Sequence, residues 1–328
     1  MISKRHSVVA TVGALSLLVI YAGLPGGVGT ALAQEARPLP EHAVELPLWP
    51  GTPPAGGEGV AGLERDITTP RDERIGGRAI IRLTGVSVPL LTYFPPKQNP
   101  LGADSVTRLH PVLVVFPGGG YTVLAYDLEG REICEWATGL GMACVLVKYR
   151  VPSSGPYPKV AAALEDAQRA LAVVHAHASQ WNLDSTRIGV AGFSAGAHLA
   201  VTLAGTSDLV YPQVDGKTAT VFKPAFVMLL YPAYLTLESD DFKLKANLTP
   251  GPGSPPTFLV QAEDDPVHVG NALAYAAALA VQGVPAELHI FAHGGHGYGL
   301  RETLDPVTHW TGLAETWLHT VGVLPAGK

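Results

Sequence analysis

From residue 111 to the end of the chain, short apolar runs alternate with longer segments whose apolar residues recur at helical spacing. Strands that alternate in this way with helices form a parallel sheet, because each helix carries the chain back across one face of the sheet. The sequence therefore predicts an α/β fold with a mostly parallel, twisted sheet of about eight strands and helices on both faces. The expected strands cover residues 111–116, 143–149, 188–191, 226–231, 257–261 and 287–291, and the expected helices cover 128–140, 159–181, 195–205, 270–282 and 306–320.

Two further strands are expected ahead of this pattern, at residues 79–84 and 88–94, with a turn at Gly85 between them. A hairpin of this kind fits an antiparallel edge on the sheet. Residues 34–75 are rich in Pro, Gly and charge, and we expect them to form an extended arm. Because 47% of the 328 residues are hydrophobic and no stretch is long enough for a large cap domain, we expect one domain over residues 76–325.

The first 33 residues have the features of a secretory signal peptide. Lys4 and Arg5 precede a nearly uncharged apolar run over residues 8–24, and the small-x-small sequence ALA follows at residues 31–33. We expect cleavage near Ala33 and export to the periplasm or the medium, with an uncleaved anchor helix as the alternative. No later run of 18 apolar residues occurs in the sequence, so no stable membrane span is expected after cleavage.

Export would permit a disulfide between the two cysteines. Cys134 falls in an expected helix and Cys144 in the strand that follows it, so packing of that helix on the sheet would bring the two side chains close together. Two buried free thiols are the alternative.

The charge pattern and the histidines argue against several kinds of partner. The formal net charge is −6 and the sequence has no run of Lys or Arg, so no nucleic-acid partner is expected. His175 and His177 are two residues apart on an expected helix and do not share a face. With two cysteines and no HExxH motif, the sequence predicts no metal site and no cofactor, and it leaves the oligomeric state open.

The sequence GFSAG at residues 192–196 carries the main chemical signal. It lies between an expected strand and an expected helix, where a sharp turn would expose Ser194 above the sheet. Glycines at both ends of the motif would let the neighbouring backbones pass closely. A serine hydroxyl becomes a good nucleophile only when a base removes its proton, so Ser194 calls for a histidine and an acid elsewhere in the chain.

A second glycine-rich segment, FPGGGY at residues 116–121, follows directly after an expected strand. Glycines allow backbone N–H groups to turn inward without a side chain in the way. We expect the N–H groups of Gly119 or Gly120, together with that of Ala195, to form an oxyanion hole beside Ser194. A plain glycine-rich turn is the alternative.

The acid and the base are expected just past the last two strands. Glu263, Asp264 and Asp265 follow the first of these strands, and a buried carboxylate there would fix the histidine tautomer. His296 stands between glycines after the second strand and is the candidate base, whereas His293 is expected to be structural or solvent-facing. The chain order of serine, acid and histidine is the one that a strand-to-helix serine turn requires.

Three neighbours of these segments are candidate substrate contacts. Tyr121 follows the glycine loop, His268 follows the acidic cluster, and Tyr298 follows the candidate base. The alternative for His268 is to cap a loop.

Several segments together resemble a family of secreted bacterial α/β-hydrolases, the acetyl-xylan-esterase-like proteins, which are related to feruloyl and carboxyl esterases. The resemblance implies an α/β-hydrolase fold. It also favours Asp264 as the triad acid, because the spacing to Val267 matches related hydrolases, with Asp265 as the second candidate. The matching pieces are LWPG (48–51), FPGGGY (116–121), EG (129–130), KYR (148–150), GFSAGAHLA (192–200), PPTF (255–258), DD (264–265) and GHG (295–297).

The same resemblance implies a serine hydrolase that cleaves small acyl esters through Ser194, Asp264 and His296. Acetyl esters of carbohydrates are the expected substrates, either small molecules or oligosaccharides. One alternative is a peptidase of the prolyl-oligopeptidase type, whose large propeller would not fit in 328 residues. The other is a non-catalytic binding protein on the same fold, which would usually have lost a triad residue.

Overall fold

The computed structural model describes residues 39–54, 63–97, 109–152, 160–214 and 220–325. All of its helices and strands belong to the unit formed by residues 40–328. The predicted signal peptide, residues 1–33, lies outside the described residues. Among the helices that are described, none is long and apolar enough to cross a membrane.

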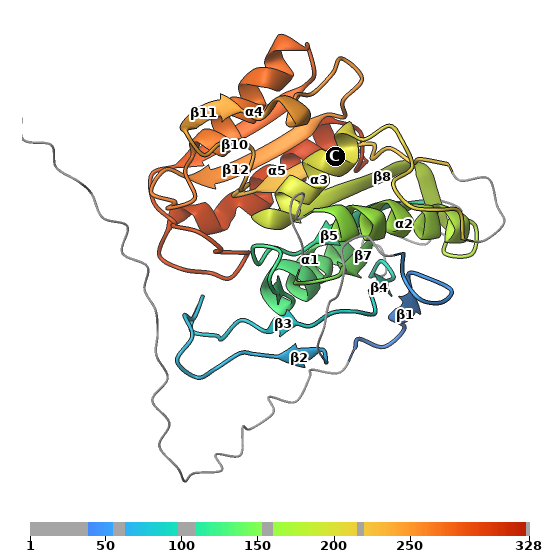
Figure 1. The fold of residues 1–328 in the computed structure, drawn as a ribbon. Coiled ribbons are helices and arrows are strands. Elements are labelled where there is room, and N and C mark those ends of the chain that lie inside the picture. Colours follow the sequence, from blue (N-terminus) through green and yellow to red (C-terminus); the bar gives the residue numbers. More distant parts are fainter. Residues whose placement is uncertain (1–38, 55–62, 98–108, 153–159, 215–219, 326–328) are drawn as a thin grey trace, which may run out of the picture. The chain divides into compact units, whose positions relative to one another are not determined.

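The centre of the fold is an eight-stranded sheet that is mostly parallel, as the alternating sequence pattern predicts (Figure 1). β4 runs antiparallel to both of its neighbours, and the remaining pairings are parallel. The strands follow one another across the sheet in the order β1 (Val44–Pro47), β4 (Leu90–Phe94), β7 (Ala143–Lys148), β5 (His110–Phe116), β8 (Leu183–Phe193), β9 (Val227–Leu230), β12 (Thr257–Ala262) and β13 (Ala286–Phe291).

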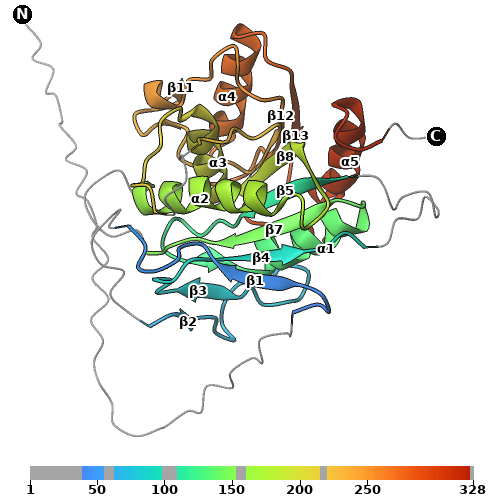
Figure 2. The same ribbon diagram turned by 90° about the vertical axis from the view of Figure 1, so that its right-hand side faces the viewer.

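Helices cover both faces of this sheet (Figure 2). Because side chains alternate along a strand, β5 sends Val112, Val114 and Phe116 into one core and Leu113 and Val115 into the other. The first core is completed by α2 (Ala161–His177), α3 (Ala195–Gly205) and α4 (Gly270–Val281). The second is completed by α1 (Glu132–Gly139), which continues a π-helical turn at Asp127–Arg131, and by α5 (Trp310–Thr320), which continues a 3-10 turn at Pro306–His309.

The predicted hairpin over residues 79–94 is wrong. β3 (Arg82–Thr84) pairs with β2 (Arg65–Asp66) and β6 (Leu124–Ala125) in a separate three-stranded sheet, and not with β4. Val86 is fully buried and forms a bridge with Val151, so the chain crosses to the main sheet instead of making a tight turn. The antiparallel edge is formed by β4 together with β1, which comes from the segment expected to be an arm.

A small hairpin that the sequence pattern does not indicate lies between β9 and β12. It consists of β10 (Thr236–Leu237) and β11 (Asp240–Leu244), and a 3-10 turn at Ala246–Leu248 follows it. The hairpin lies against the start of α4, where a side chain on Gly270 would come within 2.0 Å of the Asp241 carbonyl oxygen.

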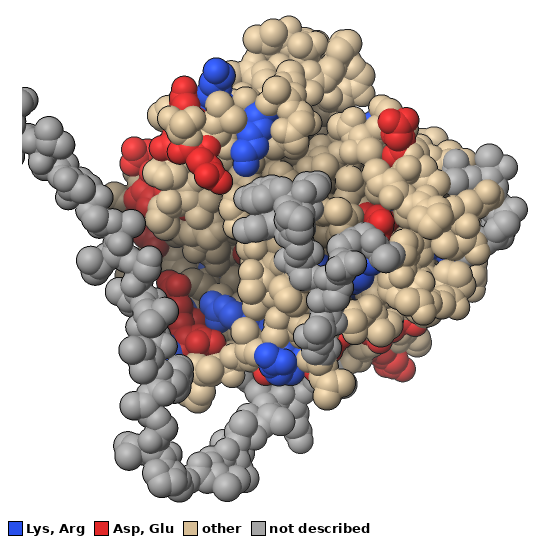
Figure 3. All heavy atoms as spheres, viewed as in Figure 1, with Lys and Arg blue, Asp and Glu red and all other residues tan. Residues whose placement is uncertain are grey.

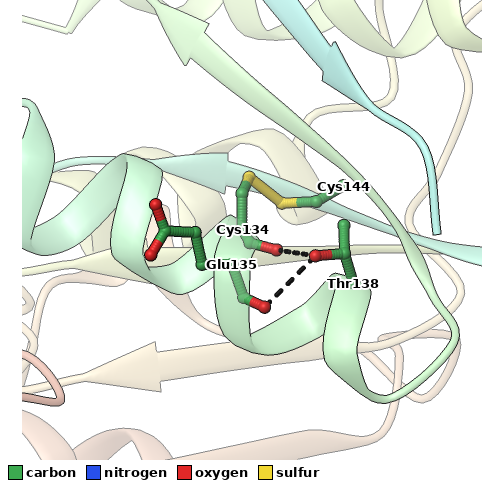
Figure 4. Close-up of a disulfide and its surroundings, with 4 residues drawn as sticks. All are labelled: Cys134, Glu135, Thr138 and Cys144. Carbon is green, nitrogen blue, oxygen red and sulfur yellow. Dashed lines mark hydrogen bonds between the residues drawn. A yellow bond between two sulfur atoms is a disulfide. The ribbon is translucent and has the colours of Figure 1, made fainter. Parts of the chain in front are cut away.

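Cys134 on α1 and Cys144 on β7 form a disulfide (Figure 4). Both residues are buried between the helix and the strand, and the Thr138 hydroxyl on the same helix donates to the Cys134 carbonyl over 2.8 Å. The alternative of two free thiols is therefore wrong, because α1 packs directly on the strand that follows it.

Candidate active site

Ser194 occupies the sharp turn between β8 and α3. Its backbone has φ 52° and ψ −115°, a conformation that L-residues rarely adopt and that persists only where the surroundings enforce it. A Cβ on Gly192 would lie 2.2 Å from the Gly196 carbonyl oxygen, and a Cβ on Gly196 would lie 2.1 Å from the Phe116 carbonyl oxygen. The two glycines of the motif are thus required by close backbone packing around the serine.

The structure brings Ser194 and His296 together across 102 residues of sequence. His296 Nε2 lies 2.8 Å from Ser194 Oγ, and His296 Nδ1 lies 2.8 Å from Asp265 Oδ2. The Asp265 side chain has no exposed surface, and it also accepts hydrogen bonds from the Val267 N–H and from the Gln261 side-chain amide. A buried carboxylate, an imidazole and a hydroxyl in this order are equipped to activate the serine.

Asp264, the acid favoured by the resemblance, does not contact His296, so the acid of this constellation is the second candidate, Asp265. β12 ends at Ala262, and the turn that follows brings Asp265 back beside Gln261 of that strand. Asp264 is left on the outside with a side chain that is 40% exposed.

Asp264 instead holds the backbone of the histidine loop. It accepts the Gly295 N–H over 2.8 Å and lies 3.3 Å from Nδ1 of the exposed His293. The Gly295 N–H, followed by the contact with His293, lowers the pKa of Asp264. The two adjacent acids therefore act on the same loop, Asp264 through its backbone and Asp265 through the His296 ring.

The glycine loop after β5 lies next to Ser194 and lines the same cavity. Gly119 has φ 127° and Gly120 has φ 64°, and a Cβ on Gly119 would lie 2.2 Å from the Val123 carbonyl oxygen. Within the described residues, the N–H groups of Gly119, Gly120 and Ala195 donate to no other group of the protein. The N-terminus of α3 and this loop thus offer donors where negative charge would develop on a substrate.

A buried carboxyl group, which sequence reasoning missed, lies beneath the glycine loop. Glu129 Oε2 accepts the Gly118 N–H over 2.6 Å, and Oε1 accepts the Tyr231 hydroxyl hydrogen over 2.8 Å. Burial raises the pKa of Glu129, and these two hydrogen bonds partly offset that rise. The Tyr231 ring in turn packs against the His296 ring with 5.1 Å between centroids. Glu129 was recognisable in the sequence only as part of the EG pair of the resemblance.

Two cavities lie in this part of the molecule. One of about 300 Å³ is lined by Ser194, His296, Gly120 and Glu129, among others. A larger one of about 560 Å³ is lined by two of the predicted substrate contacts, Tyr121 and His268. In the space-filling view, acidic and basic side chains lie beside one another around a hollow in this face (Figure 3).

Tyr298, the third predicted contact, lines neither of these cavities. Its side chain is 2% exposed and packs in the core, with 4.5 Å between its ring centroid and that of Tyr231. The loop after His296 turns inward, and the Gly299 N–H donates to the Tyr231 hydroxyl, so the structure does not bring Tyr298 together with the other two predicted contacts. Within the residues that the structure describes, no group of three or more His, Cys, Asp and Glu side chains is placed to hold a metal ion.

Comparison with protein-family models gives two matches. A family described as having the alpha/beta hydrolase fold matches residues 113–252, which include the glycine loop and the Ser194 turn. A prolyl oligopeptidase family matches residues 232–318, which include Asp265 and His296.

Curated relatives are esterases and related hydrolases. The chain is 28% identical over 205 residues to an acetylxylan esterase of Xylanibacter ruminicola, which covers 57% of this chain and 41% of that protein. It is 30% identical over 239 residues to the carboxylesterase NlhH of Mycobacterium tuberculosis, covering 64% of this chain and 71% of that protein. The chain thus spans less than half the length of the first of these relatives.

Among solved structures, an acetyl ester-xyloside bifunctional hydrolase from Caldicellulosiruptor lactoaceticus matches with a TM-score of 0.62 and 29% identity. The match covers 86% of this chain and 97% of that one, so the likeness extends over nearly the whole fold.

Proposed function

The chain belongs to the α/β-hydrolase family that is related to acetylxylan esterases and carboxylesterases, and on that premise we propose that it is a carboxylic ester hydrolase with Ser194 as its nucleophile. The observation that carries the proposal is the line of contacts from Asp265 through His296 to Ser194, with 2.8 Å at each step. Acyl transfer also needs hydrogen-bond donors that stabilise the oxyanion. The backbone N–H groups of the glycine loop, which lines the same cavity, supply these donors.

The reaction proceeds in two halves. His296 Nε2 takes the proton of Ser194 Oγ while that oxygen attacks the ester carbonyl carbon, and the oxyanion is held by N–H groups of Gly119 or Gly120 and of Ala195. When the ester C–O bond breaks, the leaving alcohol receives the proton from His296 and the acyl group stays on Ser194. A water molecule then attacks in the same way with His296 as the base, which releases the carboxylic acid and restores the serine.

The substrates that we propose are small acyl esters, in particular acetyl esters of carbohydrates. The support comes from relatives that are named as an acetylxylan esterase and as an acetyl ester-xyloside bifunctional hydrolase. The cavity of about 300 Å³ at Ser194 is compatible with a small acyl group next to the nucleophile.

We also propose that the protein acts outside the cytoplasm after cleavage near Ala33. Two observations support this proposal: the basic and apolar pattern of residues 1–33, and the disulfide between Cys134 and Cys144, since disulfides persist mainly in oxidising compartments.

The substitution Ser194→Ala tests the activity. The parent should hydrolyse p-nitrophenyl acetate and release acetate from acetylated xylo-oligosaccharides, and it should be labelled by a fluorophosphonate probe. The variant should lose all three properties while its circular dichroism spectrum is retained. Undiminished turnover by the variant would overturn the assignment of the nucleophile. A parent that the probe does not label would favour a non-catalytic binding protein.

The match of residues 232–318 to a prolyl oligopeptidase family supports a second candidate function, a serine peptidase. The same triad geometry would serve both reactions. An aminoacyl-proline p-nitroanilide compared with p-nitrophenyl acetate on the same preparation separates them, and we expect turnover of the ester only.

A further inference from the structure

The larger cavity begins directly beside the nucleophile. The Ala233 N–H donates to the Ser194 carbonyl oxygen over 3.2 Å, and the next residue, Tyr234, lines the larger cavity. The Tyr234 hydroxyl lies 3.5 Å from the point that a Cβ on Gly120 would occupy, and Gly120 lines the smaller cavity. Gly120 and Tyr234 therefore lie side by side, and the two cavities are adjacent at these residues.

One wall of the larger cavity is a neutral histidine. His198 lies one helical turn after Ser194 on α3, and its Nδ1 is 2.8 Å from the Tyr121 hydroxyl. Burial, with a smaller contribution from Lys245, lowers the pKa of His198 to about 4. The ring is thus uncharged at neutral pH. With Nδ1 facing Tyr121, Nε2 has no hydrogen-bond partner among the described residues, and the ring offers one uncharged hydrogen-bonding group in the cavity wall.

A second wall is a partly exposed aromatic ring. Tyr234 is 45% exposed although it stacks on the buried Tyr121, with 6.3 Å between ring centroids and an angle of 21° between the planes. The Lys245 ammonium group donates to the Tyr234 carbonyl oxygen over 2.9 Å, which fixes the backbone that carries the ring. An aromatic ring that is held in place and partly exposed can pack against an apolar face of a ligand.

The charges around the cavity are mixed. Glu238 and Asp241 on the hairpin side stand with Lys245 and His268, and His268 Nδ1 lies 3.5 Å from Asp241 Oδ2. Such a wall offers hydrogen-bond donors and acceptors, and its two carboxylates outnumber its one ammonium group, so it does not favour a phosphate or another anionic ligand. A pyranose ring, with a face of C–H groups and a rim of neutral hydroxyls, matches an aromatic ring surrounded by polar side chains.

We propose that the larger cavity binds the sugar that forms the alcohol part of an acetylated oligosaccharide, with His198 and Tyr234 as the residues that determine this specificity. The inference rests on the proposed ester hydrolysis at Ser194. The small acetyl group stays in the smaller cavity with Ser194 and His296, and the sugar extends past Tyr234 into the space between α3 and the β10–β11 hairpin.

The test compares two substrates that carry the same acyl group. Kinetic constants are measured with acetylated xylo-oligosaccharides and with p-nitrophenyl acetate, for the parent, Tyr234→Ala and His198→Phe. The loss in kcat/KM on the oligosaccharide should exceed the loss on p-nitrophenyl acetate by about tenfold for each variant, since one lost stacking or hydrogen-bonding contact has about this effect. The extra loss should appear mainly in KM. Phe242→Ala is the matched control, because Phe242 is an aromatic residue of the same hairpin that is 66% exposed and does not line the cavity.

Three outcomes would overturn the inference. Equal losses on both substrates would mean that His198 and Tyr234 act on the surroundings of Ser194 and not on the sugar. If Tyr234→Ala or His198→Phe changed the preference among p-nitrophenyl esters from acetate to octanoate, the larger cavity would bind the acyl group and not the sugar. A parent that hydrolyses p-nitrophenyl acetate but not the oligosaccharide would remove the sugar subsite while leaving the ester hydrolase. A parent that hydrolyses no ester would instead refute the proposed function.

A binding measurement tests the sugar contact independently of turnover. In the Ser194→Ala background, the affinity for acetylated xylo-oligosaccharide is measured by calorimetry with and without His198→Phe. We expect about tenfold weaker binding in the double variant, and equal affinities would overturn the inference.

Discussion

Glu129 Oε2 accepts the N–H of Gly118 over 2.6 Å, which places a buried carboxyl group directly beneath the glycine loop. The other carboxyl oxygen accepts the hydroxyl hydrogen of Tyr231, whose ring packs on His296. One side chain thus connects the loop that would hold the oxyanion with the surroundings of the proposed base. We therefore regard Glu129 as a positioning residue for both.

Glu129→Gln should lower kcat on p-nitrophenyl acetate by about 10- to 100-fold with little change in KM. Both partners of the carboxyl group donate hydrogen bonds, and the amide nitrogen of glutamine cannot accept one. One contact is therefore lost in the variant. Tyr231→Phe serves as the comparison. It removes the hydrogen bond to Glu129 and the one from the Gly299 N–H, but it leaves Gly118 held by the carboxylate, so we expect a smaller loss of kcat. An unchanged kcat for Glu129→Gln would show that the loop holds its shape without the carboxylate.

Substitutions of the two adjacent acids should differ strongly in their effect on kcat. Asp265→Asn should reduce kcat by about 10³- to 10⁴-fold, because an amide in place of the carboxylate no longer fixes the required His296 tautomer. Asp264→Asn keeps an oxygen that can accept the Gly295 N–H. Because a neutral acceptor only replaces a charged one, kcat should fall by less than about tenfold. Both are measured on p-nitrophenyl acetate. A larger loss for Asp264→Asn than for Asp265→Asn would reverse these roles.

Much of this site was predictable from the sequence, because most of its residues lie in short segments whose local pattern indicates their position in the fold. Ser194, the glycine loop and His296 each follow a strand, and close backbone packing demands glycine beside two of them. The choice between Asp264 and Asp265 depends on how one turn folds back on β12, which residue spacing does not specify. Glu129 was missed for a related reason, since its partners lie 11 and 102 residues away.

Contacts between residues that are distant in the sequence also limited the prediction of the fold. Alternating apolar and helical segments were enough to predict the parallel sheet and the helices on its two faces. The pairing of residues 79–94 depended on a distant contact, the bridge from Val86 to Val151, which turned an expected hairpin into strands of two sheets. The inward turn that buries Tyr298 beside Tyr231 is likewise a tertiary effect.

Gly196→Ala should destabilise the protein, by about 1–3 kcal/mol or more in the free energy of unfolding. The added methyl group would lie 2.1 Å from the Phe116 carbonyl oxygen, so either the turn at Ser194 or the end of β5 must shift. Thermal unfolding and fluorophosphonate labelling report the two effects. Gly205→Ala at the other end of α3 is the control, because a Cβ there meets nothing within 4 Å. We expect it to be neutral or slightly stabilising, and equal destabilisation by both changes would contradict the packing argument.

His198 should make the protein less stable as the pH falls from about 6.5 to 4. Its pKa is about 4 in the folded protein, where burial disfavours the charged ring, against an ordinary value of 6.5. Between these values the unfolded chain binds a proton that the folded one does not, so the free energy of unfolding falls with decreasing pH, by roughly 3 kcal/mol at most. His198→Phe should therefore show a smaller drop in Tm between pH 7 and pH 5 than the parent. His293→Phe, at a side chain that is 75% exposed, should retain the parent's drop. If both variants lose stability toward acid as steeply as the parent, the titration of His198 does not contribute.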